Sequence, residues 1–144
     1  REDIMRMVSP DGPVYQAGTL SGNPIATAAG LATLRILEAD TDIYMRLQEN
    51  TAMLADAVRH AAGNRVHVNQ IGSLMRIFFT GEDVTDYDSA TTADTKAYAD
   101  YFGFMLDHGI YVAPSQFESM FVSDAHTDAD IQKTIHVMQE YFAE

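Results

Sequence analysis

Residues 65–79 read RVHVNQIGSLMRIFF, and their hydrophobic pattern differs from that of the flanking segments. Val66 and Val68 alternate with polar neighbours, and residues 74–79 form a longer run of side chains that favour β-structure. A period of two residues is typical of strands that are half-buried in a sheet. This stretch therefore predicts strands of a small sheet.

Two helices are predicted before these strands. The first is expected near 22–38, because Asn23 can cap the N–H groups of the first turn and Pro24 supplies a preset φ there. The second is expected near 41–62, where apolar residues follow one helical stripe until Gly63.

The chain after the strands is expected to mix loops, short strands and helices. Residues 81–92 are acidic and rich in Thr, which predicts a solvated loop. Short strands are expected at 110–112 and 120–122, and a last helix is expected from Thr127. Another helix is expected before them, with a buried face that carries Ala97, Tyr98, Tyr101, Phe102, Met105 and Leu106. Separated strands and helices over one sheet predict an α+β layer structure.

The composition limits the possible functions. The chain has 144 residues and a formal net charge of −12, so nucleic acid and anionic membrane surfaces are poor candidate partners. No window has the roughly 18 uncharged apolar residues of a membrane span. The absence of cysteine excludes disulfides and thiolate chemistry. The chain begins at Arg1 without Met, so we expect a piece of a longer protein.

The segment 18–24, Gly-Thr-Leu-Ser-Gly-Asn-Pro, is a candidate anion site. It combines hydroxyl groups with glycines and the start of a helix, where backbone N–H groups and the helix dipole favour a phosphate. The alternative is a plain helix-capping loop, which the local pattern alone favours. Glu118 is either a site carboxylate or a surface residue. The five histidines are isolated, and the acidic loop lacks the calcium-loop pattern, so no metal site is expected.

Several strings resemble those of one enzyme family. Residues 15–24 read YQAGTLSGNP and residues 28–34 read AAGLATL. Further along, residues 113–118 read APSQFE, residues 121–123 read FVS and residues 125–128 read AHTD. Over essentially the whole chain, these strings resemble the glutamate-1-semialdehyde 2,1-aminomutases, a family among the class III aminotransferases. The resemblance implies the C-terminal small domain of a fold-type I pyridoxal-phosphate (PLP) enzyme, preceded by a long helix and the tail of the large domain.

The resemblance also implies roles for particular residues. Thr19 matches the threonine that reaches the PLP phosphate of the neighbouring subunit in a homodimer, and the Gly18 backbone lies beside it. Tyr15 matches an aromatic residue that approaches the site across the same interface. Glu118 matches a carboxylate near the cofactor and the substrate. Residues 1–40 would be the tail of the large domain with the connecting helix, and residues 41–144 the small domain.

The resemblance implies transfer of the amino group within glutamate-1-semialdehyde to give 5-aminolevulinate, the tetrapyrrole precursor. Lys96 and Lys133 lie away from the matching strings, and the lysine that forms the imine with PLP is upstream in the family. We therefore expect this chain to be inactive alone, without covalently bound PLP, and its parent to be cytoplasmic in a bacterium, with a plastid as the alternative.

Two other functions remain possible at this point: the C-terminal domain of another class III aminotransferase, or a non-enzymatic α+β dimerisation module. Many class III transaminases carry an arginine before the last helix, where it pairs with the substrate α-carboxylate. In this chain that position falls close to Ser119, and residues 118–120 contain no cation. This favours the aminomutase.

Overall fold

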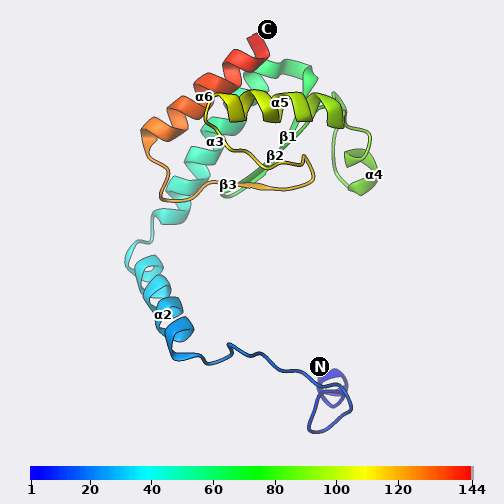
Figure 1. Cartoon of the computed structure of the whole chain (residues 1–144), viewed down its shortest axis with the longest axis vertical. Coiled ribbons are helices and arrows are strands. Elements are labelled where there is room, and N and C mark those ends of the chain that lie inside the picture. The colour runs from blue at the N-terminus through cyan, green and yellow to red at the C-terminus, as the bar shows by residue number, and fades with distance from the viewer. Residues whose placement is uncertain (144) are drawn as a thin grey trace. The chain divides into compact units, whose positions relative to one another are not determined.

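The computed structural model describes residues 1–143, and the chain divides into two compact units (Figure 1). The first unit is residues 1–41, and the second begins at Asp42. The sheet and all the buried residues belong to the second unit.

The first unit contains a short helix, α1 (Glu2–Met5), and a long one, α2 (Pro24–Ala39). The side chain of Asn23 caps α2, because its Oδ1 accepts the backbone N–H groups of Ile25 and Ala26 at 3.0 and 3.1 Å. This confirms the start predicted from the Asn-Pro pair. α1 was not predicted from the sequence.

The second unit is built around a three-stranded antiparallel sheet with the strand order β1-β2-β3. Its elements are, in chain order, α3 (Ile43–Ala62), η1 (Gly63–Arg65), β1 (His67–Ile71), β2 (Leu74–Phe78), α4 (Tyr87–Ala90), α5 (Thr95–Asp107), β3 (Met120–Phe121) and α6 (Asp128–Ala143). This confirms the predicted α+β class.

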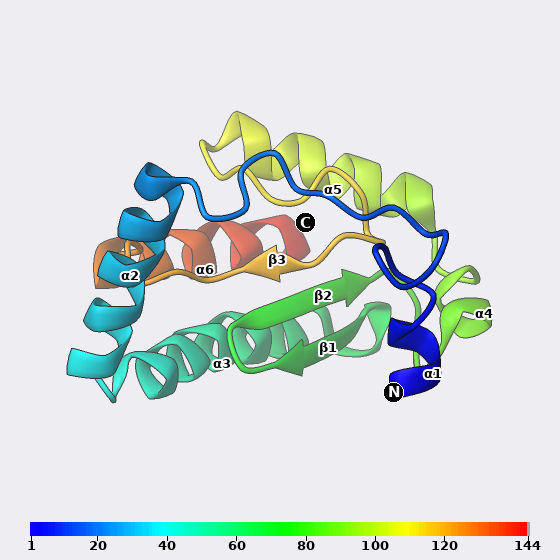
Figure 2. The ribbon, with the colours of Figure 1, turned by 90° about the horizontal axis from the view of Figure 1, so that it is seen from below.

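The two faces of the sheet have different environments. Figure 2 shows the strands side by side, with α3 and α6 along one side of the sheet. Val68, Met75 and Ile77 point into that core and are buried, as the alternating pattern predicted. On the opposite face Ile71 and Phe121 keep 77% and 67% of their surface exposed. The core is completed by Leu54, Ala55, Val58, Tyr98, Tyr101, Met105, Ile131, Val137, Met138 and Phe142.

The predicted strand at 110–112 is wrong. This segment is irregular in the structure, although Val112 is buried in the core. The reason lies in the end of α5, where Gly109 has a φ of +77° and Ile110 N–H donates to the carbonyl of Met105 at 2.8 Å. The backbone that would start a strand instead terminates a helix.

The loop at 81–92 is more structured than predicted. α4 lies within it, and its first turn is a capping box in which Asp86 and Ser89 accept each other's backbone N–H groups at 2.8 and 3.1 Å. The hydrogen bond from the Ser89 side chain is the main reason why the pKa of Asp86 is lowered. Val84 and Ala90 pack with Phe78, so this segment covers one end of the outer sheet face.

The buried face of α5 is narrower than predicted. Tyr98, Tyr101 and Met105 are buried, which fits a helical stripe with spacings of three and four residues. Leu106, which was expected on that face, is 47% exposed because the next position along a helix is rotated by about 100°.

Arg65 joins the ends of two helices. Its guanidinium donates to the carbonyls of Ala61 and Ala62 at the end of α3, both at 3.1 Å, and to the carbonyl of Phe142 near the end of α6 at 2.5 Å. It also lies 5.2 Å from the centre of the Phe142 ring, which is a cation–π distance. One cation thus serves the negative ends of both helix dipoles.

No helix within residues 1–143 is long and apolar enough to cross a membrane. No cluster of three or more His, Asp or Glu side chains in the same range has the geometry to hold a metal ion.

In the isolated 144-residue chain, we expect the amides of α2 to exchange with solvent nearly as fast as those of an unfolded peptide. None of the 16 residues of α2 is buried, and packing normally supplies most of a helix's stability. Native-state hydrogen exchange measures this, with α3 as the internal reference. Slow exchange throughout α2 in a monomer would contradict the expectation.

Candidate functional site

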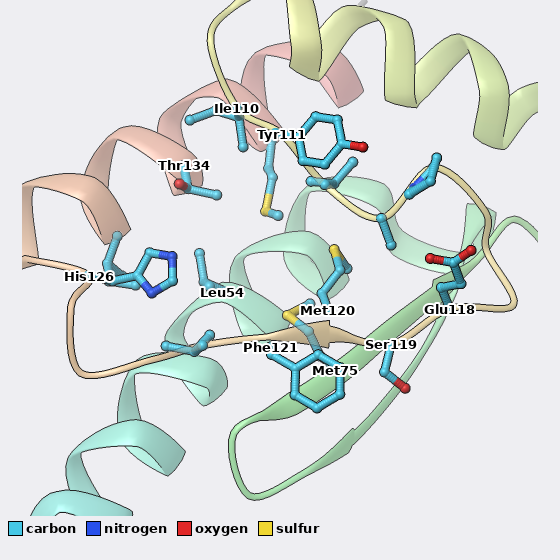
Figure 3. Close-up of a pocket in the computed structure, with 16 residues that line it drawn as sticks. Leu54, Met75, Ile110, Tyr111, Glu118, Ser119, Met120, Phe121, His126 and Thr134 are labelled. Carbon is cyan, nitrogen blue, oxygen red and sulfur yellow. The ribbon is translucent and has the colours of Figure 1, made fainter. Parts of the chain in front are cut away.

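Glu118 lies at the edge of a cavity of about 430 Å³ in the second unit (Figure 3). Most of the lining is apolar and comes from α3, α6, the sheet and the segment 110–114. Figure 3 shows the Glu118 carboxylate and the His126 ring at opposite ends of this space. Neither Lys nor Arg is among the described residues that line it. The described lining therefore combines an apolar wall with one carboxylate and one histidine, and with no lysine or arginine.

The irregular segment 113–119 that carries Glu118 is fixed by hydrogen bonds. At its start, the Tyr98 hydroxyl donates to the carbonyl of Ala113 at 2.6 Å. In its middle, Ser115 accepts the Glu118 N–H through its carbonyl at 2.9 Å. At its end, Arg76 Nε donates to the hydroxyl of Ser119 at 2.9 Å.

The pKa of Tyr98 reflects both its burial and its proximity to Glu118. Burial raises the pKa of Tyr98 to about 12, and the nearby negative charge of Glu118 contributes in the same direction. The phenol therefore stays protonated at neutral pH and remains a hydrogen-bond donor to Ala113.

Arg76 was not identified from the sequence. It lies on β2 opposite Asn69 and next to Ser119, and it lines a separate hollow of about 250 Å³ on the outer sheet face. A guanidinium thus reaches the position before the last helix from a neighbouring strand, although residues 118–120 themselves contain no cation. The sequence feature that could have identified Arg76 is its position as a charged residue inside the apolar run 74–79.

Gln116 is the buried polar residue of the same segment. Its side chain is only 3% exposed, and neither amide atom has a hydrogen-bond partner among the described residues. A buried polar group without a partner costs about 1–3 kcal/mol. A hydrogen bond to the Gln116 amide from a group outside residues 1–143, or from a water molecule, would remove this cost.

Replacing Gln116 by methionine is expected to raise the free energy of unfolding of the 144-residue chain by about 1 kcal/mol, because the unpaired amide is removed at similar volume. Urea denaturation followed by circular dichroism measures the change. Leu106→Met, an apolar exchange at a half-exposed position, is the control. A loss of stability in Gln116→Met would show that the amide is paired in solution.

His126 was predicted to have no special role, but it lines the cavity. Its Nδ1 accepts the backbone N–H of Ser123 at 3.0 Å, so the proton of the neutral ring is assigned to Nε2. The neighbouring Thr127 and Asp130 cap α6, since Thr127 N–H donates to the Asp130 carboxylate at 2.8 Å. The ring is thus held by the turn before α6.

The other predicted site residues lie in the first unit. Tyr15 is 82% exposed, and Thr19 is also exposed. Gly18 accepts the N–H of Ser21 at 3.1 Å, and a β-carbon at position 18 would collide with the Ser21 hydroxyl. A larger residue at position 18 would require the Ser21 side chain to rotate away. The backbone N–H and hydroxyl groups of Thr19 have no partner within residues 1–143.

The first N–H groups of α2 donate to the Asn23 side chain, as the Asn-Pro pair predicted, so these groups are not free for an anion. Any anion at this turn would be held by Thr19 and the adjacent backbone, because the helix end is already capped. The predicted Tyr15, Gly18 and Thr19 thus share one unit, and Glu118 belongs to the other.

The sequence is similar to several curated proteins. It is 49% identical over 144 residues to glutamate-1-semialdehyde 2,1-aminomutase 2 of Lachnoclostridium phytofermentans. The matched region covers 98% of this chain and 34% of that protein. It is 51% identical over 150 residues to the glutamate-1-semialdehyde 2,1-aminomutase of Deinococcus deserti, covering 99% of this chain and 34% of that protein. The chain thus spans about a third of the length of these relatives. No family model matches the sequence.

Solved structures share the fold. A β-phenylalanine aminotransferase from Variovorax paradoxus superposes with a TM-score of 0.78 at 27% identity, over 99% of this chain and 34% of that one. A glutamate-1-semialdehyde aminomutase from Pseudomonas aeruginosa PAO1, in complex with PMP, gives a TM-score of 0.73 at 20% identity, over 93% of this chain and 31% of that one. The expected architecture, part of a fold-type I aminotransferase, is confirmed.

Proposed function

We propose, from the premise that this chain is a segment of the glutamate-1-semialdehyde 2,1-aminomutase family, that its parent protein is a PLP-dependent aminomutase that converts glutamate-1-semialdehyde to 5-aminolevulinate. The proposal is supported by about 50% identity over nearly all of the chain to proteins of that name. The observation that carries it in the structure is the cavity lined by the carboxylate of Glu118 and by no lysine or arginine among the described residues.

The charge of this cavity favours the aminomutase over an amino-acid transaminase. An α-amino acid presents a carboxylate where glutamate-1-semialdehyde has an aldehyde. A site for the amino acid needs a cation for that carboxylate, and an arginine suits it best because its donors match both oxygens. Glu118 instead repels a carboxylate while leaving the neutral aldehyde unaffected.

PLP fits the turn around Thr19. When bound, this cofactor supplies an electron sink for cleavage of the bond next to the amino nitrogen. In this proposal the Thr19 hydroxyl and the backbone around Gly18 hold its phosphate, since the turn presents them without other partners in the described chain. Tyr15, with 82% of its surface exposed, is available to cover a site on a second subunit.

The proposal places the complete site in a homodimer of the parent. Lys96 and Lys133 do not line the cavity with Glu118, so the lysine that binds PLP would come from the parent sequence outside this chain. The 144-residue chain would then be inactive alone, and the parent would be a cytoplasmic enzyme of a bacterium, in line with the bacterial relatives.

The competing function is that of an amino-acid transaminase, which the structural similarity to a β-phenylalanine aminotransferase keeps open. Steady-state kinetics of the full-length parent decide between the two. We expect formation of 5-aminolevulinate from glutamate-1-semialdehyde without an added amino donor. Efficient transfer of amino groups from α-amino acids to 2-oxoglutarate would show that the aminomutase proposal is wrong.

A further inference from the structure

We propose that Tyr98 and Arg76 are positioning residues that fix the Glu118 carboxylate at the cavity; the inference rests on the proposed function of the parent. The two side chains hold opposite ends of the segment 113–119, and neither has a role in the resemblance to known enzymes. They would act on the reaction only through Glu118.

The two anchors come from different elements of the core. The Tyr98 hydroxyl, on α5, donates to the carbonyl of Ala113 at 2.6 Å. Arg76 Nε, on β2, donates to the hydroxyl of Ser119, the residue directly after Glu118, at 2.9 Å. A segment with no regular secondary structure is therefore tied at its first and last residues to a helix and to a strand.

Both anchors belong to regular elements of the second unit. The Tyr98 ring is 3% exposed and packs edge-on against Phe79, with ring centres 6.1 Å apart. The backbone at Arg76 is held in β2, where the neighbouring Met75 and Ile77 are buried in the core, while the Arg76 side chain lies half-buried on the outer face. A packed side chain such as Tyr98, attached to a rigid element, can fix a neighbouring segment to the fraction of an ångström that catalysis requires.

The fixed segment leaves the Glu118 carboxylate available. Its backbone N–H donates to the carbonyl of Ser115 at 2.9 Å, which closes a turn within the segment. Its carboxylate has no hydrogen bond or ion pair with another described residue, while Figure 3 shows it at the end of the cavity. The backbone is held and the charged group is free to face a ligand.

Loss of either anchor should slow the reaction without unfolding the protein. In the full-length holoenzyme, we expect Tyr98→Phe, Arg76→Met and Ser119→Ala each to lower kcat for glutamate-1-semialdehyde by about three- to tenfold, the effect of losing one hydrogen bond. Arg76→Met and Ser119→Ala remove the donor and the acceptor of the same bond, and Ser119→Ala does so without changing the charge, so it isolates the effect of the bond.

Tyr101→Phe is the matched control. Tyr101 lies on the same helix as Tyr98 and is completely buried, but its hydroxyl has no partner among the described residues. Its replacement by phenylalanine should leave kcat unchanged, because it removes a phenol oxygen that does not touch the segment 113–119.

The decisive measurement repeats the three anchor variants in a Glu118→Gln background. If the anchors act through Glu118, their effects on kcat should disappear there, whereas general damage to the structure would multiply with the Gln substitution. Unchanged kcat in the anchor variants, or effects that multiply fully in the Gln background, would overturn the inference.

A second measurement separates this inference from the proposed function. Hydrogen exchange at the Glu118 amide of the full-length protein should become about tenfold faster in Tyr98→Phe and in Arg76→Met, with α3 and α6 unchanged. This expectation holds whatever reaction the parent catalyses. Unaltered exchange at Glu118 would overturn the anchoring role, while a lack of aminomutase activity in the wild type would overturn the proposed function alone.

Discussion

Replacing Glu118 by arginine in the full-length parent is expected to lower kcat/KM for glutamate-1-semialdehyde by about a hundredfold, and Glu118→Gln by about tenfold. Loss of one preorganised electrostatic group at a reacting centre typically costs about 10²–10³ in rate, and the smaller effect of Gln follows because it keeps the shape and an acceptor oxygen of Glu. The arginine also adds a cation to a cavity whose described lining has none. Initial rates of 5-aminolevulinate formation, with PLP in excess, measure both changes.

The same arginine should improve recognition of α-amino acids. A guanidinium in place of Glu118 can pair with an α-carboxylate, so KM for glutamate in a half-reaction should fall in Glu118→Arg relative to the wild type. Glu140→Gln, which removes an exposed carboxylate from α6, is the control and should leave both rates unchanged. Wild-type rates in both Glu118→Gln and Glu118→Arg would show that Glu118 is a surface residue without a role in the reaction.

Thr19→Val is expected to weaken retention of PLP by about ten- to a hundredfold in the full-length dimer, because a hydrogen bond to a charged group is worth about 1.5–3 kcal/mol. Valine has nearly the same shape as threonine, so the turn between Gly18 and Ser21 should survive. Equilibrium dialysis followed by cofactor absorbance measures the affinity.

Thr27→Val, the same exchange at an exposed position on α2, is the control for the loss of a hydroxyl. Mixed dimers give a further distinction. If Thr19 serves the neighbouring subunit, a Thr19→Val subunit should impair cofactor binding at the site of an unmodified partner. Wild-type PLP affinity in Thr19→Val would show that the turn is a helix-capping loop that does not bind the phosphate.

The elements that the sequence predicted correctly are those with local signals. The Asn-Pro pair begins α2 because the Asn23 side chain accepts N–H groups only two and three residues ahead. α3 ends at Gly63, which has a positive φ of 60° that favours glycine. The alternation around Val68 placed β1, because a strand with one buried face repeats every two residues.

The parts of the site that the sequence did not predict depend on contacts between distant residues. Arg76 and Ser119 are 43 positions apart, and they meet because β3 pairs with β2. The sequence predicted that Tyr98 lies on the buried face of a helix. Its hydrogen bond to Ala113, however, depends on how α5 packs. Hydrophobic periodicity carries no information on such pairs, so the environment of Glu118 required the structure.

The bridge made by Arg65 has a consequence for the way the second unit unfolds. The end of a chain normally frays first, but here the carbonyl of Phe142 is tied to a guanidinium 77 positions earlier. Loss of Phe142 would therefore remove a hydrogen bond and a cation–π contact from Arg65, which lies 77 positions earlier, while its local bonds to Ala61 and Ala62 stay in place.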